Sequence, residues 1–301
     1  MAKRFGQRSA TAPGDRDVVL RMLDRISRIA LDVIKGTNSE FTKGGKKNPQ
    51  VARSAKKITP HLAVALMPDG SLAISGNTGE KKVTDNDKTV VEREIKKFVE
   101  SGAEPYGAHS KPKDRNKLGA LVSGDYAAGH AEASALRTIA DALEKPIGWL
   151  VAQRADKDEK EGVSQHGEMT LLGRLVEHWR ENPGDPGRPQ EVMLGGVKKA
   201  CLACQWAFEA VDEHIGKPLG YKVVVAGTHG QYFPGWRMPN WITDENPKYK
   251  DQNEVVRKSI EDKARGTEGV EVDGDKLQGS MSEMKNGHDP DASASEWEEE
   301  G

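Results

Sequence analysis

Two short stretches, Gly129-His130-Ala131-Glu132 and Cys201-Leu202-Ala203-Cys204, contain the residue types that build a metal centre. Cys201 and Cys204 are the only cysteines in the 301 residues, and they open a segment with helical apolar spacing. His130 and Glu132 open another such segment. Residues three positions apart in a helix face the same side, so both thiols can reach one ion. We therefore predict that His130, Cys201 and Cys204 bind Zn²⁺ and leave a fourth position for water, as catalytic zinc sites do.

The order of these residues resembles the zinc-dependent nucleobase (cytidine/cytosine) deaminase superfamily, whose signature is His-x-Glu followed by Pro-Cys-x-x-Cys. Ala200 stands where that signature has proline, and Cys201 follows His130 by 71 positions, which implies an insertion. The resemblance covers about residues 60–245 and extends to bacterial toxin-type deaminases of nucleic acids. It implies an α/β fold of three α/β/α layers, with a mixed sheet, an opening β-hairpin and two zinc-bearing helices.

The resemblance also implies an enzyme that hydrolyses the amino group of a nucleobase, with cytosine to uracil in a nucleic acid or nucleotide as the expected reaction. A zinc-activated water would be the nucleophile, and Glu132 would shuttle its protons. Ala131 and Asn77 would contact the base, although Asn77 could equally complete a turn. The alternatives are deamination of a free nucleoside or base, a non-catalytic zinc-stapled nucleic-acid-binding module, and a redox pair of Cys201 and Cys204.

Apolar spacing and turn residues predict the elements around these stretches. Helical spacing occurs over about 16–35, 88–101 and 131–143. Strand-like segments at 61–67 and 71–76 flank Pro68-Asp69-Gly70, a sequence typical of a hairpin turn. Further strands are predicted at 147–152, 191–196 and 221–227. The last two are joined by the cysteine helix, so they should form a parallel pair.

The predicted catalytic domain spans residues 59–245, with an insertion at about 155–190. It follows a disordered basic arm (1–15) and an N-terminal helix with a basic linker (16–58). It precedes a possible helix (246–266) and an acidic disordered tail (267–301). His166 and His178 lie in the predicted insertion and could be ligands, but a lone histidine is more often an ordinary surface group.

Charge is distributed unevenly along the chain, although the net charge is only −2. Residues 251–301 contain 15 acidic and 6 basic residues, so the preceding part is basic. A basic body favours an anionic partner such as single-stranded DNA or RNA, and the tail would be a mobile competitor or a solubilising segment. The aromatic segment 229–241 could stack a base or pack on the core.

The expected environment follows from what the sequence lacks and from its thiols. It contains no secretory signal and no apolar run of membrane-spanning length. A zinc thiolate pair suits a reducing compartment. We therefore expect a cytoplasmic protein with a nucleobase-containing substrate and no membrane partner, and the resemblance adds a possible homo-oligomer.

Overall fold

The computed structural model describes residues 13–37, 61–76, 83–101, 130–151, 165–197, 199–225, 227–228, 236–244, 246–267, 270–273 and 276–279. Its centre is a five-stranded mixed sheet with the strand order β3-β2-β1-β4-β5. The strands are β1 (Leu62–Leu66), β2 (Leu72–Gly76), β3 (Gly148–Val151), β4 (Gln190–Gly196) and β5 (Tyr221–Val225). β1 is antiparallel to β2 and β4, whereas β2–β3 and β4–β5 are parallel pairs.

The tight turn between β1 and β2 is built by the residue types that the sequence places there. Gly70 has a φ of 80°, in the left-handed region that a glycine adopts without a Cβ penalty. Its N–H donates to the Met67 carbonyl, and the Asp69 carboxylate accepts from the Ser71 N–H at 2.8 Å. These bonds fix the register of the two strands, which pair from Leu62–Gly76 to Leu66–Leu72.

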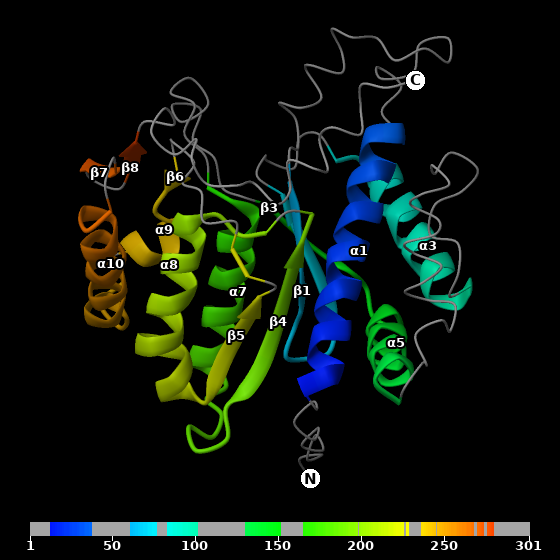
Figure 1. Ribbon diagram of the computed structural model, residues 1–301, viewed down its shortest axis with the longest axis horizontal. Helices are drawn as coiled ribbons and strands as arrows, with labels where there is room; N and C mark the ends of the chain where they lie inside the picture. The colour runs from blue at the N-terminus through cyan, green and yellow to red at the C-terminus, as the bar shows by residue number, and fades with distance from the viewer. Residues whose placement is uncertain are drawn as a thin grey trace, which may run out of the picture.

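Helices cover both faces of the sheet, which gives three layers (Figure 1). α1 (Pro13–Thr37), α3 (Asp85–Ser101) and α5 (His130–Leu143) lie on one face, and α7 (Gly167–Glu181) and α8 (Leu202–Val211) lie on the other. A π-helical turn, η3 (Asp212–Gly216), and a 3₁₀ turn, η4 (Lys217–Leu219), continue α8 toward β5. Among the described helices, none has the length and apolar character that a membrane crossing requires.

A second group of elements packs outside α8. It contains α9 (Asn240–Thr243), α10 (Lys250–Arg265) and a small antiparallel sheet of β6 (Trp236–Arg237), β8 (Lys276–Gly279) and β7 (Val270–Asp273). Apolar side chains of α10 and β7 join the same core as α7 and α8. The described part of the chain from 236 to 279 therefore extends the core on the α8 side.

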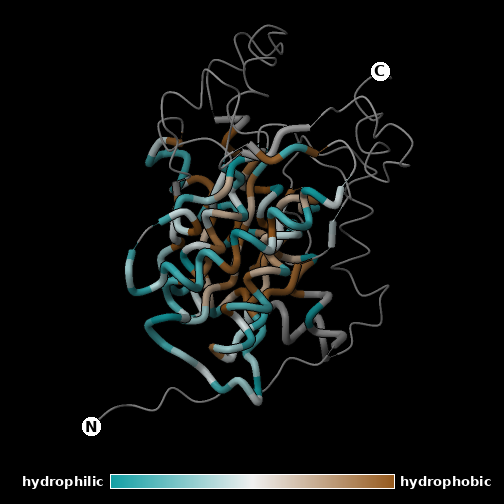
Figure 2. The backbone as a smooth tube through the Cα atoms, turned by 90° about the vertical axis from the view of Figure 1, so that its left-hand side faces the viewer, coloured by the Kyte–Doolittle hydropathy of each residue, from teal (hydrophilic) through white to brown (hydrophobic). Residues whose placement is uncertain are grey.

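The alternation of side chains along β1 and β2 explains why both faces are covered. Leu62 and Val64 point into the core shared with α1, α3 and α5, whereas Ala63 and Ala65 point toward α7. The small alanines leave room for the larger side chains of α7, and all four strand residues are buried. Figure 2 shows the resulting hydrophobic interior along the middle of the molecule.

The α/β class, the mixed sheet and the parallel β4–β5 pair agree with the sequence prediction. Two of the predicted segments contain elements that pack on the core. The helix within the predicted insertion is α7, and its apolar stripe, including Met169, Leu172 and Trp179, is fully buried against the sheet. The predicted disordered tail contains β7 and β8, because Val270 and Val272 add to the core. Residues 280–301 lie outside the described part.

Candidate metal centre

The candidate site lies at one edge of the central sheet, where α7 and α8 both begin. β2, β4 and β5 end at this edge and β1 starts there, because β1 runs against β2 and β4. Gly167 allows α7 to begin directly against β2, since a Cβ at this position would lie 2.7 Å from the Ser75 carbonyl oxygen. The first turns of the two helices thus meet at the top of the sheet in Figure 1.

Three potential metal ligands converge at this edge, namely His166, Cys201 and Cys204. His166 Nδ1 lies 3.5 Å from the Cys201 sulfur and 3.4 Å from the Cys204 sulfur. All three ligand atoms lie within 4.8 Å of one another. Both cysteines are buried and neither forms a disulfide. One imidazole and two thiols at these separations can bind a single ion.

Local helix geometry places the two sulfurs together. Cys201 is the N-cap residue of α8, and its sulfur accepts a hydrogen bond from the Cys204 backbone N–H at 3.4 Å. Trp236 Nε1 donates to the Cys204 sulfur, also at 3.4 Å. N–H donors and the positive end of a helix dipole both favour thiolates. The site is therefore prepared for the charge that a metal-binding thiol must carry.

The titration behaviour of the three groups reflects their proximity. A hydrogen bond from Cys204 lowers the pKa of Cys201 well below its ordinary value, and the His166 contact assists against the opposing effect of burial. Burial raises the pKa of Cys204 well above its ordinary value, and the neighbouring Cys201 adds to this increase. Burial lowers the pKa of His166. The hydrogen bond and the charge of Cys201 raise this pKa by more than burial lowers it, so the net shift is upward.

A buried carboxylate, Glu168, lies in the first turn of α7, two residues after His166. Its side chain is 5% exposed, and its Oε1 lies 2.9 Å from Nε2 of His61, which is also buried. Burial raises the pKa of Glu168, but the His61 charge and hydrogen bond outweigh burial and hold the pKa below its ordinary value. Its second oxygen, Oε2, has no hydrogen-bond partner among the described residues. One oxygen is therefore held by His61, while the other is buried and available for a ligand.

The donor set fits zinc. Zn²⁺ prefers imidazole nitrogen and thiolate sulfur, and catalytic zinc sites have three protein ligands plus one open position. His166, Cys201 and Cys204 supply such a set, and no fourth histidine, cysteine or carboxylate joins the group among the described residues. Glu168, in the first turn of α7 after the N-cap His166, adds a buried acceptor, Oε2, and its charge acts on all three candidate ligands.

The predicted ligand His130 lies at the start of α5, and its role at the metal stays a prediction. His130 and Glu132 begin α5, which packs against α1 and α3 on the face of the sheet opposite α8. The side chains of His130, Ala131 and Glu132 lie outside the described residues, as does Asn77 after β2. Cys201 and Cys204 are brought together as predicted, but their histidine partner in the described structure is His166.

The sequence prediction named His166 as a possible ligand but favoured a surface role for it, and it did not consider Glu168. His166-Gly167-Glu168 is itself a His-x-Glu sequence, and it precedes Cys201 by 35 positions instead of 71. The buried stripe of α7 follows it directly, and the strand at 190–196 comes after a loop of eight residues. The sequence contained this signal, because a domain in which the helix, the strand and the cysteine helix follow one another after His166 needs no insertion before Cys201. By contrast, nothing in the sequence singles out His61.

The two described tryptophans of the aromatic segment 229–241, Trp236 and Trp241, pack on the core. Trp236 is fully buried, and its indole N–H reaches the Cys204 sulfur. Trp241 Nε1 donates to the Met169 carbonyl at 3.0 Å and fits against Gly173 of α7. Both side chains therefore support the metal centre and α7, and Tyr232 and Phe233 lie outside the described residues.

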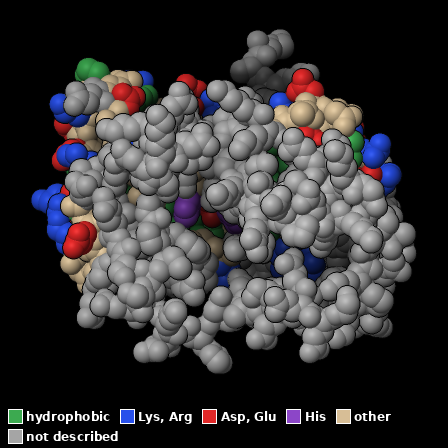
Figure 3. Space-filling view, turned by 90° about the horizontal axis from the view of Figure 1, so that it is seen from above, with side chains coloured by type: hydrophobic (Ala, Val, Ile, Leu, Met, Phe, Trp, Pro, Cys, Tyr) green, Lys and Arg blue, Asp and Glu red, His purple; other side chains and the backbone are tan. Residues whose placement is uncertain are grey.

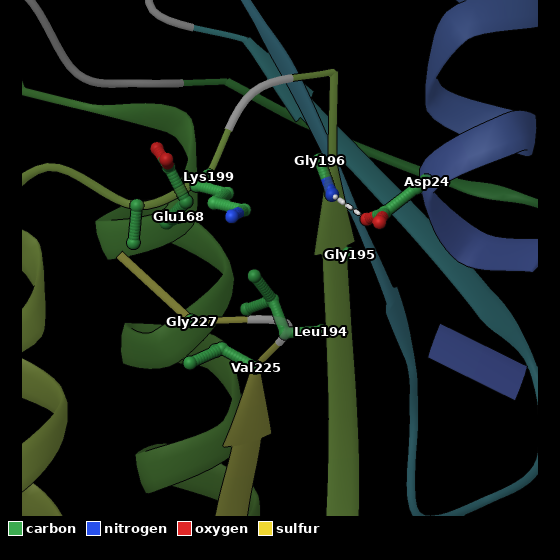
Figure 4. A pocket seen from close by; sticks show the side chains of 9 residues that line it. Asp24, Glu168, Leu194, Gly195, Gly196, Lys199, Val225 and Gly227 are labelled. Atoms are coloured by element: carbon green, nitrogen blue, oxygen red, sulfur yellow. Dashed lines mark hydrogen bonds between the residues drawn. The ribbon is translucent and has the colours of Figure 1, made fainter. Parts of the chain in front are cut away.

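A small cavity opens beside the metal centre. Its lining includes Glu168 from α7, Asp24 from α1, and Leu194, Lys199 and Val225 near the ends of β4 and β5. In Figure 4, Glu168 and Asp24 lie on opposite sides, with Leu194 and Val225 beneath them. Figure 3 views this end of the molecule and shows histidine and acidic side chains in a central hollow.

Comparison with known proteins supports a deaminase. Residues 165–240 match the model of the OTT_1508-like deaminase family, and this range contains His166, Glu168, Cys201 and Cys204. No curated protein and no solved structure matched the chain. The match and the His/Cys/Cys group are both consistent with the cytidine-deaminase-like superfamily.

Proposed function

We propose that this protein is a zinc-dependent hydrolytic nucleobase deaminase, with cytosine in a nucleic acid or nucleotide as the expected substrate and uracil as the product. The observation that carries the proposal is the group of His166, Cys201 and Cys204 beside the buried, half-unpartnered carboxylate of Glu168. The deaminase match over residues 165–240 includes all four residues. A zinc staple without catalysis would not need a free carboxylate oxygen at this point.

The three ligands would hold Zn²⁺, which as a Lewis acid would supply a nucleophilic water near neutral pH. The chain prepares the site for that ion. Cys201 already favours the thiolate, and the Trp236 N–H supports negative charge on the second sulfur. Burial of both cysteines excludes bulk water from the sulfurs, which strengthens every electrostatic interaction in the site.

Glu168 would move the protons. Its lowered pKa keeps the carboxylate ionised at neutral pH, so Oε2 can accept a proton from the attacking water. Water would add to the ring carbon that bears the amino group, and Glu168 would pass the proton to the adjacent ring nitrogen. A second proton transfer through Glu168 would convert the amino group into ammonia, which leaves as the carbonyl forms. His61 would keep Oε1 fixed during both transfers.

The proposal of a nucleic-acid or nucleotide substrate rests on charge. Residues 1–250 are basic overall, in contrast to the acidic C-terminal part. Basic surfaces raise the local concentration of phosphate-bearing ligands. Single-stranded DNA or RNA is the proposed macromolecular partner, and a free nucleoside or base is the alternative substrate.

The test compares the zinc-loaded protein with Glu168→Gln. Ammonia release is measured with cytosine, cytidine, cytidine monophosphate and a cytosine-containing single strand, and the strand is sequenced for C-to-U changes. We expect Glu168→Gln to lose at least about a hundredfold in rate, the scale of general acid–base catalysis, while it retains zinc. Glu177→Gln is the matched control, because Glu177 lies on the same helix in an exposed ion pair with Arg174. Equal rates in the two variants would remove Glu168 from the mechanism.

A further inference from the structure

The cavity beside the metal centre has two carboxylates on opposite walls. Glu168 comes from α7 and Asp24 comes from α1, so the two helices reach the cavity from opposite faces of the sheet (Figure 4). Leu194 and Val225 form an apolar floor between them. The proposed reaction uses only Glu168, so Asp24 has no role in it.

A backbone hydrogen bond holds the Asp24 carboxylate in place. Its Oδ1 accepts a hydrogen bond from the Gly196 backbone N–H at 2.8 Å, across the end of β4. Close approach is possible because Gly195 has no side chain, since a Cβ there would lie 2.8 Å from Asp24 Oδ1 and 2.6 Å from Leu23 Cβ. One oxygen is thus fixed by the backbone, and the second oxygen, Oδ2, is left for other partners at the cavity.

The positive groups around Asp24 do not fully compensate for the burial of its carboxylate. Burial raises the pKa of Asp24 to about 6, although the Gly196 N–H and the charges of Arg25, His61 and Lys199 lower it. These are the charged and titratable groups that act on Asp24, and Glu168 lies across the cavity. An ionised carboxylate with this pKa costs stability at neutral pH. Replacement by a neutral side chain would avoid that cost, so its presence suggests a use.

We propose that Asp24 is a substrate-binding residue that accepts a hydrogen bond from an N–H or O–H group on the part of the base or nucleoside remote from the reacting amine. This inference rests on the proposed deaminase function. The ring would lie on Leu194 and Val225, with its amino group toward the metal centre and Glu168. The donor at its far end would reach Oδ2 of Asp24. In free cytosine this donor is the ring N–H that a nucleoside lacks, and in cytidine it is a sugar hydroxyl.

The Gly196 contact makes Asp24→Asn a sharp probe. Asparagine can accept the Gly196 N–H only through its carbonyl oxygen, so its amide nitrogen must take the place of Oδ2. The substitution therefore keeps the size and the backbone contact but turns the exposed acceptor into a donor. A substrate that presents a donor should be rejected, whereas one that presents an acceptor should be tolerated.

Binding is measured separately from turnover. Zinc-loaded Glu168→Gln protein is titrated calorimetrically with cytosine, cytidine and 2′-deoxycytidine, with and without Asp24→Asn. We expect the added substitution to weaken binding about ten- to hundredfold, the range for a hydrogen bond to a charged group. Loss with cytosine alone identifies the ring N–H as the donor. Loss with both nucleosides identifies the 3′- or 5′-hydroxyl, and loss with cytidine alone identifies the 2′-hydroxyl. Asp251→Asn, at an exposed position of α10, is the matched control.

The outcomes separate this inference from the proposed function. Equal affinities with and without Asp24→Asn, or no binding of any of the three compounds, would overturn the substrate-binding role of Asp24. Ammonia release by the wild-type protein with unchanged affinity in Asp24→Asn would keep the deaminase and reject the role of Asp24. Binding that depends on Asp24, without ammonia release by the wild type, would keep this binding role and reject the deaminase. Retained zinc content in Asp24→Asn shows that the metal centre is intact.

Discussion

Substitution of Asp24 by asparagine should stabilise the protein at neutral pH and not at acidic pH. In the unfolded chain the carboxyl group has the ordinary pKa of 3.8, whereas burial raises its pKa to about 6 in the folded protein. The folded state therefore holds a proton that the unfolded state has lost between these two values. The contribution of Asp24 to stability is fully present below pH 3.8 and is lost as the pH rises through about 6.

The size of this effect follows from the two pKa values. A difference of one pKa unit corresponds to about 1.4 kcal/mol, so the full change between 3.8 and about 6 is about 3 kcal/mol. Between pH 4 and 7.5, where unfolding is practical to measure, about 2.5 kcal/mol of this should appear. Asparagine does not titrate and can keep the Gly196 hydrogen bond. The stability gain of Asp24→Asn should therefore grow by about this amount over that pH range.

The assay is urea unfolding of the wild type and Asp24→Asn at matched pH and zinc concentration, from pH 4 to pH 7.5. Contributions of titrating groups that do not interact with Asp24 cancel in the difference between the two proteins. Asp251→Asn, at an exposed position, provides the control. A gain from Asp24→Asn that is the same at pH 4 and 7.5, or that shrinks as the pH rises, would refute the argument.

Three further substitutions test the support of the site. Replacing His61 by alanine should lower kcat about ten- to hundredfold with little change in KM or zinc content, because the Glu168 carboxylate loses its partner. Replacing His61 by glutamine should restore part of the rate. A loss of zinc that matches the loss of rate would contradict this positioning role. Gly167→Ala should lower the free energy of unfolding in urea by about 1–3 kcal/mol and weaken zinc binding, because the added Cβ would clash with the Ser75 carbonyl. Unchanged zinc affinity would argue against this close approach. Trp236→Phe should cost about 1 kcal/mol in zinc binding measured by competition with a chelator, since it removes the indole N–H from the second sulfur; equal affinity would make that contact irrelevant.

Much of the fold could be predicted from local patterns. The strands at 61–67 and 71–76 were placed by the turn chemistry of Pro68-Asp69-Gly70 and by apolar runs. The parallel pair of β4 and β5 followed from a strand–helix–strand order. These features depend on residues close in sequence, so single-sequence reasoning reaches them. The layer to which each helix belongs depends on distant contacts, so local patterns did not show that α7 covers the sheet beside α8.

The sequence singled out the two sulfurs of the candidate metal centre but did not favour His166 as their partner. Cys201 and Cys204 are unique in the chain, and their spacing fits one helical turn. Two His-x-Glu sequences could supply the third ligand, at His130 and at His166, and the prediction used only the first. His166 is placed near the cysteines by the close contact of Gly167 with the Ser75 backbone of β2, and no local sequence pattern predicts that contact.

The most direct test of the account is the metal content of the purified protein and of two histidine variants. We predict one zinc per chain in the wild type and in His130→Ala, and loss of zinc from His166→Ala. His178→Ala, on the same helix as the proposed ligand, should keep the metal. Zinc that survives in His166→Ala but disappears in His130→Ala would contradict the central claim that His166 completes the site with Cys201 and Cys204.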